Sequence, residues 1–401
     1  MRNLILFDDE TREHLLPLTH TRPSSMLLCG ILNLCEKWEN YLQGKASFIT
    51  SEYLTGKFPI QIHDENLVIN GTILPNTRLV KLIGELKANE ALTAEGDLVA
   101  ANIPGSEFDA IIDGTFANEI AGYKLTETPV SQIRRSWDLL RLCKDELLRD
   151  FELITKNRSS QTLDVTNVMI GDGDLFMEEG ASVYGSMFNT HAGPIYIGKG
   201  ATIMEGCFIR GPVAIREGAV LKMGTKLYGP VVIGPYAKVG GEINHSIVMA
   251  YSNKSHDGYL GNSVIGEWCN LGAGTNVSNL KNNYSEVRMW NYVQQRFEHT
   301  GQQFLGIVMG DHTKCGISTM FNTGTVIGVS ANIYGAGYPR NFIPSFSWGG
   351  AAGWQTFQLD KALALATTVM DRRGMTFTAA DRDILTYVFN LAAPYRTWEK
   401  K

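Results

Sequence analysis

The chain has 401 residues, 44% of them hydrophobic, and carries 36 basic against 41 acidic side chains, for a formal charge of −5. This balance, without a run of lysine or arginine, excludes the basic surface that nucleic acids and anionic membranes attract. The apolar run at the amino terminus is too short for a signal peptide, and no window is long enough to span a bilayer. We therefore expect a soluble, cytoplasmic protein whose partners are small molecules and further copies of itself.

Residues 1–128 alternate short apolar runs, such as LILF and ENLVINGTIL, with one helical stretch over 24–42. This alternation predicts a small α/β domain. In 129–158, the apolar residues of SWDLLRLCKDELLRDFELI recur at helical spacing, which predicts a helix that links this domain to the next. The six cysteines are scattered singly, so we expect reduced, buried thiols and neither a disulfide framework nor a metal site.

Residues 159–350 contain a repeat of 18 residues. The positions that mark it most clearly are Gly193, Gly211 and Gly229, together with Ile197, Ile215 and Ile233. Within each unit a branched aliphatic residue recurs about every six positions. A six-residue step with one inward side chain, three steps to a turn, predicts a parallel β-helix of triangular cross-section. Most of these glycines and aliphatic residues then serve the winding alone.

The repeat fails over 281–303, where charged and aromatic residues become frequent, and resumes at FLGIVMGDHTKCG. We expect this excursion to be an arm on the coil, since insertions in repeat proteins often lie on the binding face. Residues 351–401 contain two helical patterns, the second opened by Thr378 and Asp381 in capping-box spacing. They predict a short helical cap.

The segment KSHDGYLGNSVIGEWCNLGAGTNVSN, at 254–279, sets one histidine among glycines and asparagines. Together with the arm and GIVMGDHTKCG, it resembles the acetyltransferase signature of the bifunctional N-acetylglucosamine-1-phosphate uridyltransferase/glucosamine-1-phosphate acetyltransferase family, including its archaeal sugar-1-phosphate branch. The resemblance implies a left-handed β-helix of hexapeptide repeats and a homotrimer. It also implies an acetyl-CoA-dependent N-acetyltransferase that acts on an amino-sugar 1-phosphate or a nucleotide sugar.

By this resemblance, His256 is the general base that removes a proton from the sugar amine. Tyr259 and Asn270 would hold the sugar phosphate and the amine, and Asn279 would complete the pocket. The chemistry fits, because imidazole titrates near neutrality and amide side chains bind a polyhydroxyl sugar without adding charge. The alternative is that His256 is an ordinary loop histidine and that the asparagines form a stacked ladder.

The resemblance also implies a site for acetyl-CoA. The backbone N–H near Ala273 would meet the oxyanion of the transferred acetyl group, because glycine-rich backbone lets donors approach closely. Gly335 is assigned to the same cofactor. The serine that contacts coenzyme A in the family is replaced here by Ile317.

The basic residues expected to bind the sugar phosphate differ from those of the family. Lys222 stands where an arginine is usual, and it offers a point charge in place of a bidentate fork. The paired lysines of the family fall at Gly240 and Gly241, so Lys238 or Lys254 would have to substitute for them.

The opening LILFDDETREHLLPLTHTRPSSML resembles that of the sugar nucleotidyltransferases, in which Thr11, Arg12 and Arg22 would contact the nucleotide. However, Asp8 and Asp9 stand where glycines normally expose backbone N–H groups to a triphosphate, and carboxylates there repel phosphate. This part of the domain is therefore expected to be weak, altered in substrate or inactive.

The metal-binding part of this domain also differs from the family pattern in a way that disfavours activity. Thr72 replaces the aspartate that holds magnesium, and a neutral hydroxyl is a poor ligand for that ion. Asp8, Asp9 and Asp97 could rebuild a metal site, although such clusters are more often solvated surface charge. We expect a Mg²⁺ requirement only if the domain is active. Two alternatives to the acetyltransferase therefore remain: a uridylyl- or thymidylyltransferase acting on a sugar 1-phosphate, and a non-catalytic module that binds nucleotide sugars.

Overall fold

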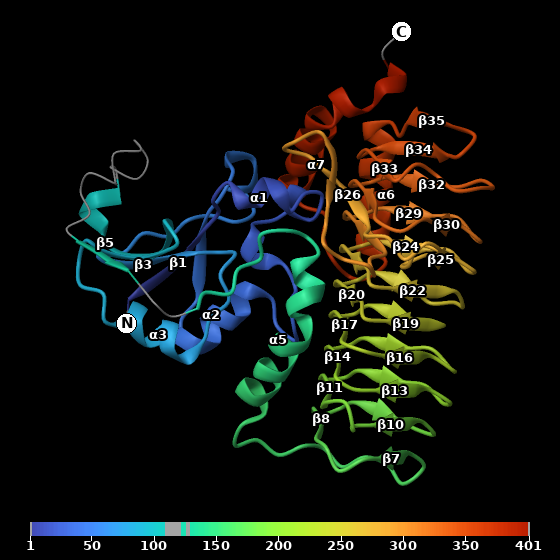
Figure 1. The fold of residues 1–401 in the computed structure, drawn as a ribbon, viewed down its shortest axis with the longest axis horizontal. Helices are drawn as coiled ribbons and strands as arrows, with labels where there is room; N and C mark the ends of the chain where they lie inside the picture. Colours follow the sequence, from blue (N-terminus) through green and yellow to red (C-terminus); the bar gives the residue numbers. More distant parts are fainter. Residues whose placement is uncertain (1, 109–121, 126–128, 400–401) are drawn as a thin grey trace. The chain divides into compact units, whose positions relative to one another are not determined.

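The structure, a computed structural model, describes residues 2–108, 122–125 (backbone only) and 129–399 (Figure 1). It divides into two compact units. The first, here called the sheet unit, comprises Met1–Leu15, Arg22–Leu27 and Leu32–Arg135. The second, the coil unit, comprises Leu16–Thr21, Leu28–Ile31 and Ser136–Lys401. The domain boundary expected at residue 128 lies outside the described residues.

The sheet unit contains a six-stranded mixed sheet in the order β2-β1-β3-β5-β4-β6. Its strands are β1 (Asn3–Phe7), β2 (Ala46–Ile49), β3 (Glu65–Asn70), β4 (Glu90–Ala94), β5 (Asp97–Pro104) and β6 (Gly122–Leu125). Strand β1 pairs in parallel with both β2 and β3, as the predicted α/β class requires, and β5 runs antiparallel between β3 and β4. The α-helices described in this unit are α1 (Thr11–His14), α2 (Leu34–Leu42) and α3 (Thr77–Gly84).

The helix predicted over 24–42 is shorter than expected, because α2 begins only at Leu34. Asn33 caps it: its side chain accepts the Glu36 N–H at 2.7 Å, and the Glu36 carboxylate accepts the Asn33 N–H at 2.8 Å. Upstream, Gly30 has a φ of +88°, a conformation that an α-helix cannot include. Within the predicted range, the chain before Gly30 forms only a 3₁₀ turn, η2 (Ser24–Met26).

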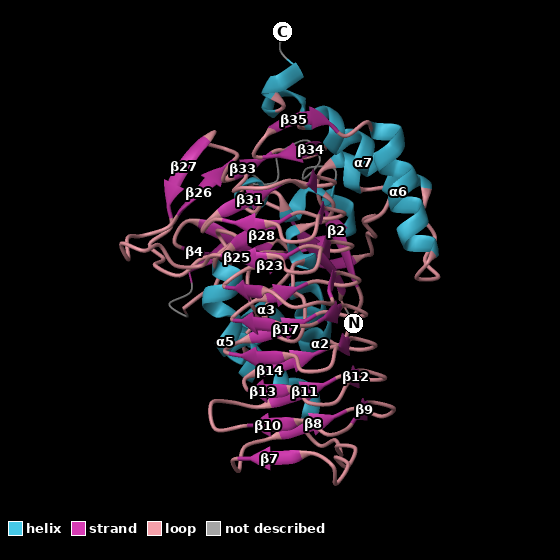
Figure 2. Ribbon diagram, turned by 90° about the vertical axis from the view of Figure 1, so that its right-hand side faces the viewer, coloured by secondary structure: helices cyan, strands magenta, loops and turns pink. Residues whose placement is uncertain are grey.

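The coil unit begins with α5 (Asp138–Thr155), the predicted linking helix, and continues as a left-handed parallel β-helix with three faces (Figures 1 and 2). The first face holds β7 (Val168–Ile170), β10 (Met187–Asn189), β13 (Phe208–Arg210), β16 (Lys226–Tyr228), β19 (Glu242–Asn244) and β22 (Tyr259–Gly261), and is continued by β25 (Asn276–Val277) and β30 (Met320–Phe321). The second face holds β8 (Leu175–Met177), β11 (Ile195–Ile197), β14 (Val213–Ile215), β17 (Val231–Ile233), β20 (Ile247–Val248), β23 (Val264–Ile265), β28 (Ile307–Met309), β31 (Thr325–Ile327) and β33 (Phe342–Ile343). The third face holds β9 (Ser182–Val183), β12 (Thr202–Ile203), β15 (Val220–Leu221), β18 (Lys238–Val239), β21 (Asn253–Lys254), β24 (Asn270–Leu271), β29 (Lys314–Cys315), β32 (Asn332–Ile333), β34 (Ser347–Gly350) and β35 (Gly353–Thr356).

Strand register confirms the predicted 18-residue repeat. Ile197 pairs with Ile215, and Ile215 with Ile233, so that the same position of successive coils stacks along one line. All three side chains are fully buried in the continuous core of the coil. The hexapeptide pattern therefore predicted both the architecture and the residues that fill it.

The corner between the second and third faces carries a stack of rings. Tyr236, Tyr251, Trp268 and His312 occupy equivalent positions, each with a positive φ, and successive ring centroids lie 5.2, 4.2 and 6.3 Å apart. A left-handed conformation costs a non-glycine residue about 1–3 kcal/mol. Stacking contributes about 0.5–1.5 kcal/mol per pair, so the rings offset part of the strain of the corner that they form.

Near the carboxyl end, the coil is interrupted by a β-hairpin, β26 (Arg288–Asn291) with β27 (Arg296–His299). The predicted carboxyl-terminal helices are α6 (Leu359–Asp371) and α7 (Ala379–Leu391), and they lie away from the hairpin in the view of Figure 2. Thr378 and Asp381 form the capping box. All six cysteines are buried and free, as expected. Among the described residues, no helix has the length and apolarity needed to cross a membrane.

Candidate functional site

His256 lies on the corner between the third and first faces, here called the histidine corner (residues 222–225, 240–241, 255–258, 272–275 and 316–319 of successive coils). Backbone hydrogen bonds stack these turns: the Gly274 N–H donates to the Asp257 carbonyl at 2.9 Å, and the Ser318 N–H donates to the Ala273 carbonyl at 2.7 Å. The His256 side chain is exposed and bonds to no side chain or backbone group in the described part of the chain. It is therefore free to meet a ligand.

Two glycines of the preceding coil allow the turn that carries His256 to pack closely against that coil. A Cβ at Gly240 would lie 2.5 Å from the Ser255 carbonyl oxygen, and one at Gly241 would lie 2.8 Å from the Asp257 Cα. Side chains are therefore excluded from the two positions where the family resemblance would place lysines. This close approach explains the departure from that pattern.

Lys254 does not present its ammonium group to a substrate, contrary to our expectation. The side chain is only 2% exposed, and Nζ donates to the carbonyls of Gly240 at 3.1 Å and His256 at 2.9 Å. Burial lowers the pKa of Lys254 to about 8. Lys254 thus fixes the backbone of the histidine corner from inside the coil.

Tyr259 and Asn279 are brought together, as the sequence suggested, at the end of a hydrogen-bond chain. The Asn279 amide donates to the Tyr259 hydroxyl oxygen at 3.0 Å and to Asn262 Oδ1 at 2.7 Å. Asn262 Nδ2 lies 3.2 Å from His245 Nδ1, and His245 Nε2 lies 3.0 Å from the Leu140 carbonyl of α5. Since that carbonyl only accepts, Nε2 carries the imidazole proton and Nδ1 accepts from Asn262.

This chain sets the direction in which Tyr259 can bond. Its oxygen already accepts from Asn279, so the phenolic hydrogen remains available to a ligand. Burial raises the pKa of Tyr259, which keeps that hydrogen in place at neutral pH. Tyr259 is therefore suited to donate to a phosphate or a sugar oxygen.

Asn270 lies on a different face from Tyr259. It pairs in register with Asn253 and Lys314 on the third face, and its exposed side chain bonds to no group that the structure describes. In one copy of the chain, the two residues thus flank the His256 edge from opposite faces. They do not form one pocket within a single coil.

A cluster of cations lies on the third face beside this edge, and part of it was missed by the sequence analysis. Arg373, from the turn after α6, donates to Asn253 Oδ1 at 2.9 Å, and Asn253 pairs in register with Lys238. The positive charges of Arg373 and Lys222, together with some burial, lower the pKa of Lys238. None of the three cations forms an ion pair with a described carboxylate, so the cluster presents unneutralised positive charge.

The positions expected to meet acetyl-CoA follow each other along the histidine corner. The Ala273 N–H donates to no backbone acceptor within the described ranges. On the next coil, Ile317 is 77% exposed. One coil further, Gly335 has a φ of +101° and open space where a Cβ would lie. These successive positions therefore combine one N–H group that has no backbone acceptor with an open, apolar surface.

In the sheet unit, the loop expected to meet phosphate, here called the phosphate loop, is occupied by the chain's own side chains. Asp9 Oδ1 accepts the Thr11 N–H at 2.9 Å, and Asp8 Oδ1 accepts the Ser24 N–H at 2.9 Å. Arg12 lies 3.4 Å from Asp8 through Nε and donates to the Tyr53 hydroxyl at 2.6 Å. Burial raises the pKa of Asp8. Side-chain carboxylates thus occupy donors that a triphosphate would need.

The predicted nucleotide and metal contacts of this unit are also buried or paired. Arg12 and Arg22 are 8% and 5% exposed. Thr72 is fully buried; its hydroxyl donates to Asn70 at 2.7 Å and accepts from Gln132 at 2.9 Å. The remaining candidate ligand, Asp97, pairs with Arg134 at 2.9 Å. Across the described residues, no three His, Cys, Asp or Glu side chains come together in a group that could hold a metal ion.

Parts of this chain are similar to known proteins. Residues 4–159 match the sugar nucleotidyl transferase family. The chain is 37% identical over 144 residues to the bifunctional sugar-1-phosphate nucleotidylyltransferase/acetyltransferase of Sulfurisphaera tokodaii, a match that covers 35% of each chain. It is also 37% identical over 87 residues to the bifunctional protein GlmU of Methanocaldococcus jannaschii, covering 22% of this chain and 21% of that one.

These matches span about a third or less of the length of the relatives. Among solved structures, the superposition on an Arabidopsis UDP-N-acetylglucosamine acyltransferase covers 59% of this chain and 82% of the Arabidopsis chain, at 14% identity and a TM-score of 0.23. A superposition of that quality adds nothing to the fold, which rests on the strand register described above.

Proposed function

We propose that this chain, a member of the GlmU-like family, is an acetyl-CoA-dependent N-acetyltransferase that acts on an amino-sugar 1-phosphate or a nucleotide sugar. The observation that carries the proposal is His256, an exposed and unbonded imidazole on a corner whose backbone is fixed by Lys254. A free imidazole at a rigidly held position is what general-base catalysis near neutral pH requires.

In the proposed reaction, the sugar amine attacks the thioester carbonyl while neutral His256 accepts the proton that the amine loses. The new C–N bond forms as a tetrahedral oxyanion develops, and the Ala273 N–H is the donor proposed to stabilise it. When the intermediate collapses, the C–S bond breaks, and the coenzyme A thiolate takes the proton back from the imidazolium. Acetyl-CoA supplies the activated acyl group and no other cofactor is required.

We assign the phosphate of the sugar to the cation cluster formed by Lys222, Lys238 and Arg373. Like charges gathered without a carboxylate partner favour a bound anion, and the guanidinium of Arg373 can form two parallel hydrogen bonds to phosphate. Tyr259 would donate its free phenolic hydrogen to the same substrate, and Asn270 would bind a sugar hydroxyl or the amine. These contacts come from two faces of the coil.

Because the contacts come from two faces, we propose that the site is completed by a neighbouring copy in a homotrimer. The first face offers a contact surface: Val168, Met187 and Phe208 pair in register and are exposed by 49%, 36% and 51%. Met187 and Phe208 also line a hollow of about 480 Å³. Contiguous exposed apolar residues of this kind mark interaction sites. Phe208→Glu should convert a trimer into a monomer on light scattering, and a monomeric wild-type protein would contradict the assembly.

For the sheet unit, we propose that nucleotidyl transfer has been lost. The donors of its phosphate loop are bonded to Asp8 and Asp9, and its metal position holds a buried threonine. Incubation with nucleoside triphosphates, magnesium and sugar 1-phosphates should release no pyrophosphate. Measurable release would restore the bifunctional alternative.

The acetyltransferase is tested by incubating the protein with acetyl-CoA and a panel of amino-sugar 1-phosphates and measuring released thiol. His256→Ala should lower the rate by about 10²–10⁴-fold, the usual contribution of a general base. His191→Ala, which removes an exposed loop histidine from the same coil unit, is the matched control and should retain the rate. A folded protein that releases no thiol with any member of the panel, or an active His256→Ala variant, would refute the proposal.

A further inference from the structure

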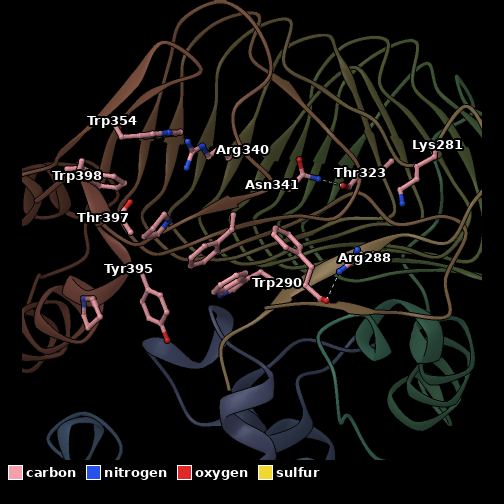
Figure 3. A pocket seen from close by; sticks show the side chains of 14 residues that line it. Lys281, Arg288, Trp290, Thr323, Arg340, Asn341, Trp354, Tyr395, Thr397 and Trp398 are labelled. Atoms are coloured by element: carbon pink, nitrogen blue, oxygen red, sulfur yellow. Dashed lines mark hydrogen bonds between the residues drawn. The ribbon is translucent and has the colours of Figure 1, made fainter. Parts of the chain in front are cut away.

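A second hollow, of about 700 Å³, lies on a different corner of the coil unit (Figure 3). It opens between the β26–β27 hairpin, the corner that joins the first face to the second in the last coils, and the segment that follows α7. We call it the tryptophan pocket, after Trp290, Trp354 and Trp398, which line it. None of its lining residues belongs to the histidine corner. Its volume lies within the range of about 300–1,000 Å³ that is usual for small-molecule sites.

Flat aromatic surfaces form much of its wall. Trp290 of β26 stacks on Phe342 of β33, with ring centroids 4.3 Å apart and planes 12° from parallel. Tyr395 meets the edge of Phe342 at 5.7 Å. Trp354 and Trp398 form a second stacked pair at 6.3 Å. Rings held against each other in this way offer preformed faces on which a planar ligand can stack.

The charged residues of the lining are all cationic. Lys281, Arg288 and Arg340 line the hollow, and no aspartate or glutamate does. Lys281 donates to the Glu286 carbonyl at 2.6 Å and Arg288 to the Phe297 carbonyl at 3.1 Å, so neither charge is neutralised. Arg340 is exposed and bonds to no residue that the structure describes. Guanidinium groups in this setting favour the planar, two-point binding of phosphate.

Unused polar atoms complete the pocket. Trp290 Nε1 is buried and lacks a hydrogen-bond partner among the described residues, which is costly unless a ligand or water supplies one. Asn341 donates to the Thr323 carbonyl at 2.8 Å, and its Oδ1 remains able to accept (Figure 3). One spare donor and one spare acceptor beside aromatic faces suit the edge of a nucleobase.

We infer that the tryptophan pocket binds a nucleotide, with the base stacked on the aromatic wall and the phosphates at Arg340, Arg288 and Lys281. The same chemistry has two sources, the adenosine phosphate end of coenzyme A and the nucleoside diphosphate of a nucleotide sugar. The inference does not rest on acetyl transfer at the histidine corner, because the two sites share no residue.

Three of its wall residues are tryptophans, so binding can be followed by intrinsic fluorescence of the full-length protein. We would titrate it with UDP, dTDP, ADP and coenzyme A, and with inorganic pyrophosphate as a probe of charge alone. We expect saturable quenching by at least one nucleotide below millimolar concentration, with pyrophosphate binding at least about tenfold more weakly. Saturation by UDP or dTDP would identify a nucleotide sugar as the source, and saturation by ADP and coenzyme A would identify the cofactor.

Arg340→Ala is the decisive variant, because this exposed side chain contacts nothing whose loss would unfold the chain. It should weaken nucleotide binding about 10- to 100-fold, as expected when a charge-assisted contact is removed. Lys361→Ala, on the exposed surface of α6, is the control and should bind as wild type does. Pyrophosphate binding as tightly as the nucleotides, no saturable quenching at millimolar concentrations, or equal affinity in Arg340→Ala and wild type would each overturn the inference.

Discussion

The phosphate loop of the sheet unit and the histidine corner of the coil unit differ in what satisfies their polar groups. In the loop, Asp8 and Asp9 accept the N–H groups of Ser24 and Thr11. In the corner, structural groups bond to one another, and the side chain of His256 is left open. In the loop, carboxylates of the chain itself accept from the backbone donors, whereas the corner leaves an imidazole without a hydrogen-bond partner among the described residues.

The largest effect should come from placing the missing family lysine back into the corner. Gly241 has a φ of +74°, and a Cβ there would lie 2.8 Å from the Asp257 Cα, so Gly241→Lys must displace the His256 turn. We expect a loss of about 4 kcal/mol in unfolding free energy, at the upper end for a single substitution, together with loss of acetyl transfer. Chemical denaturation and thiol release measure both effects.

Gly224 provides the matched control on the same corner. Its φ is +72°, but nothing lies within 4 Å of the position of a Cβ. Gly224→Lys should therefore cost only the strain of a left-handed residue, about 1–2 kcal/mol. Equal losses in the two variants would show that contact with the His256 turn is not what requires a glycine.

The next effect concerns Lys254 and depends on pH. Its folded pKa is about 8, against an ordinary value of 10.5, so between these pH values the unfolded chain binds more protons than the folded one. The unfolding free energy should therefore rise by up to about 3 kcal/mol as the pH increases from 8 to 10.5, and this gain should be lost as the pH falls back to 8. Lys254→Met should remove this contribution and lower kcat, because the His256 carbonyl loses its donor.

A variant at Lys314 distinguishes the two expected consequences of Lys254→Met, the change in the pH dependence of stability and the fall in kcat. Burial lowers its pKa to about 8 as well, but Nζ donates to the His312 and Trp268 carbonyls at the corner between the second and third faces. Lys314→Met should flatten the pH dependence of stability in the same way while leaving kcat unchanged. A drop in kcat in both variants would mean that Lys254 acts through general stability and not by positioning His256.

The repeat predicted neither the burial of Lys254 nor the contribution of Arg373. Lys254 pairs with Val239, an inward position, but follows it by 254 − 239 = 15 residues, so the 18-residue spacing does not place its side chain in the core. We expected a substrate contact because Lys254 could substitute for the paired lysines of the family. Arg373 lies 120 residues from Asn253 and belongs to no repeat, so only the fold brings them together. Periodicity predicts what stacks along a coil, and long-range packing decides what covers it.

Removal of one cation should have an intermediate effect. Arg373→Ala is expected to raise the KM for the sugar phosphate about tenfold with little change in kcat, because it removes a binding charge and no proton-transfer group. The effect should shrink at high salt, as for any contact between exposed charges. Arg372→Ala, which removes the neighbouring exposed arginine, should leave KM unchanged. An equal rise in KM in both variants would show that the loss of one positive charge, and not the position of Arg373, is responsible.

The smallest effect is expected where the phosphate loop is reopened. Asp9→Asn removes a charge but keeps the shape of the side chain, and it weakens the hold on the Thr11 N–H. Because one repulsive carboxylate has been neutralised, binding of a nucleoside triphosphate should strengthen by only about threefold, and calorimetry can measure the change. Pyrophosphate release should stay absent, since Thr72 still offers no anionic ligand to magnesium. If Asp9→Asn alone released pyrophosphate, the buried threonine would not be the barrier, and the contrast between a closed loop and an open corner would reduce to a single carboxylate.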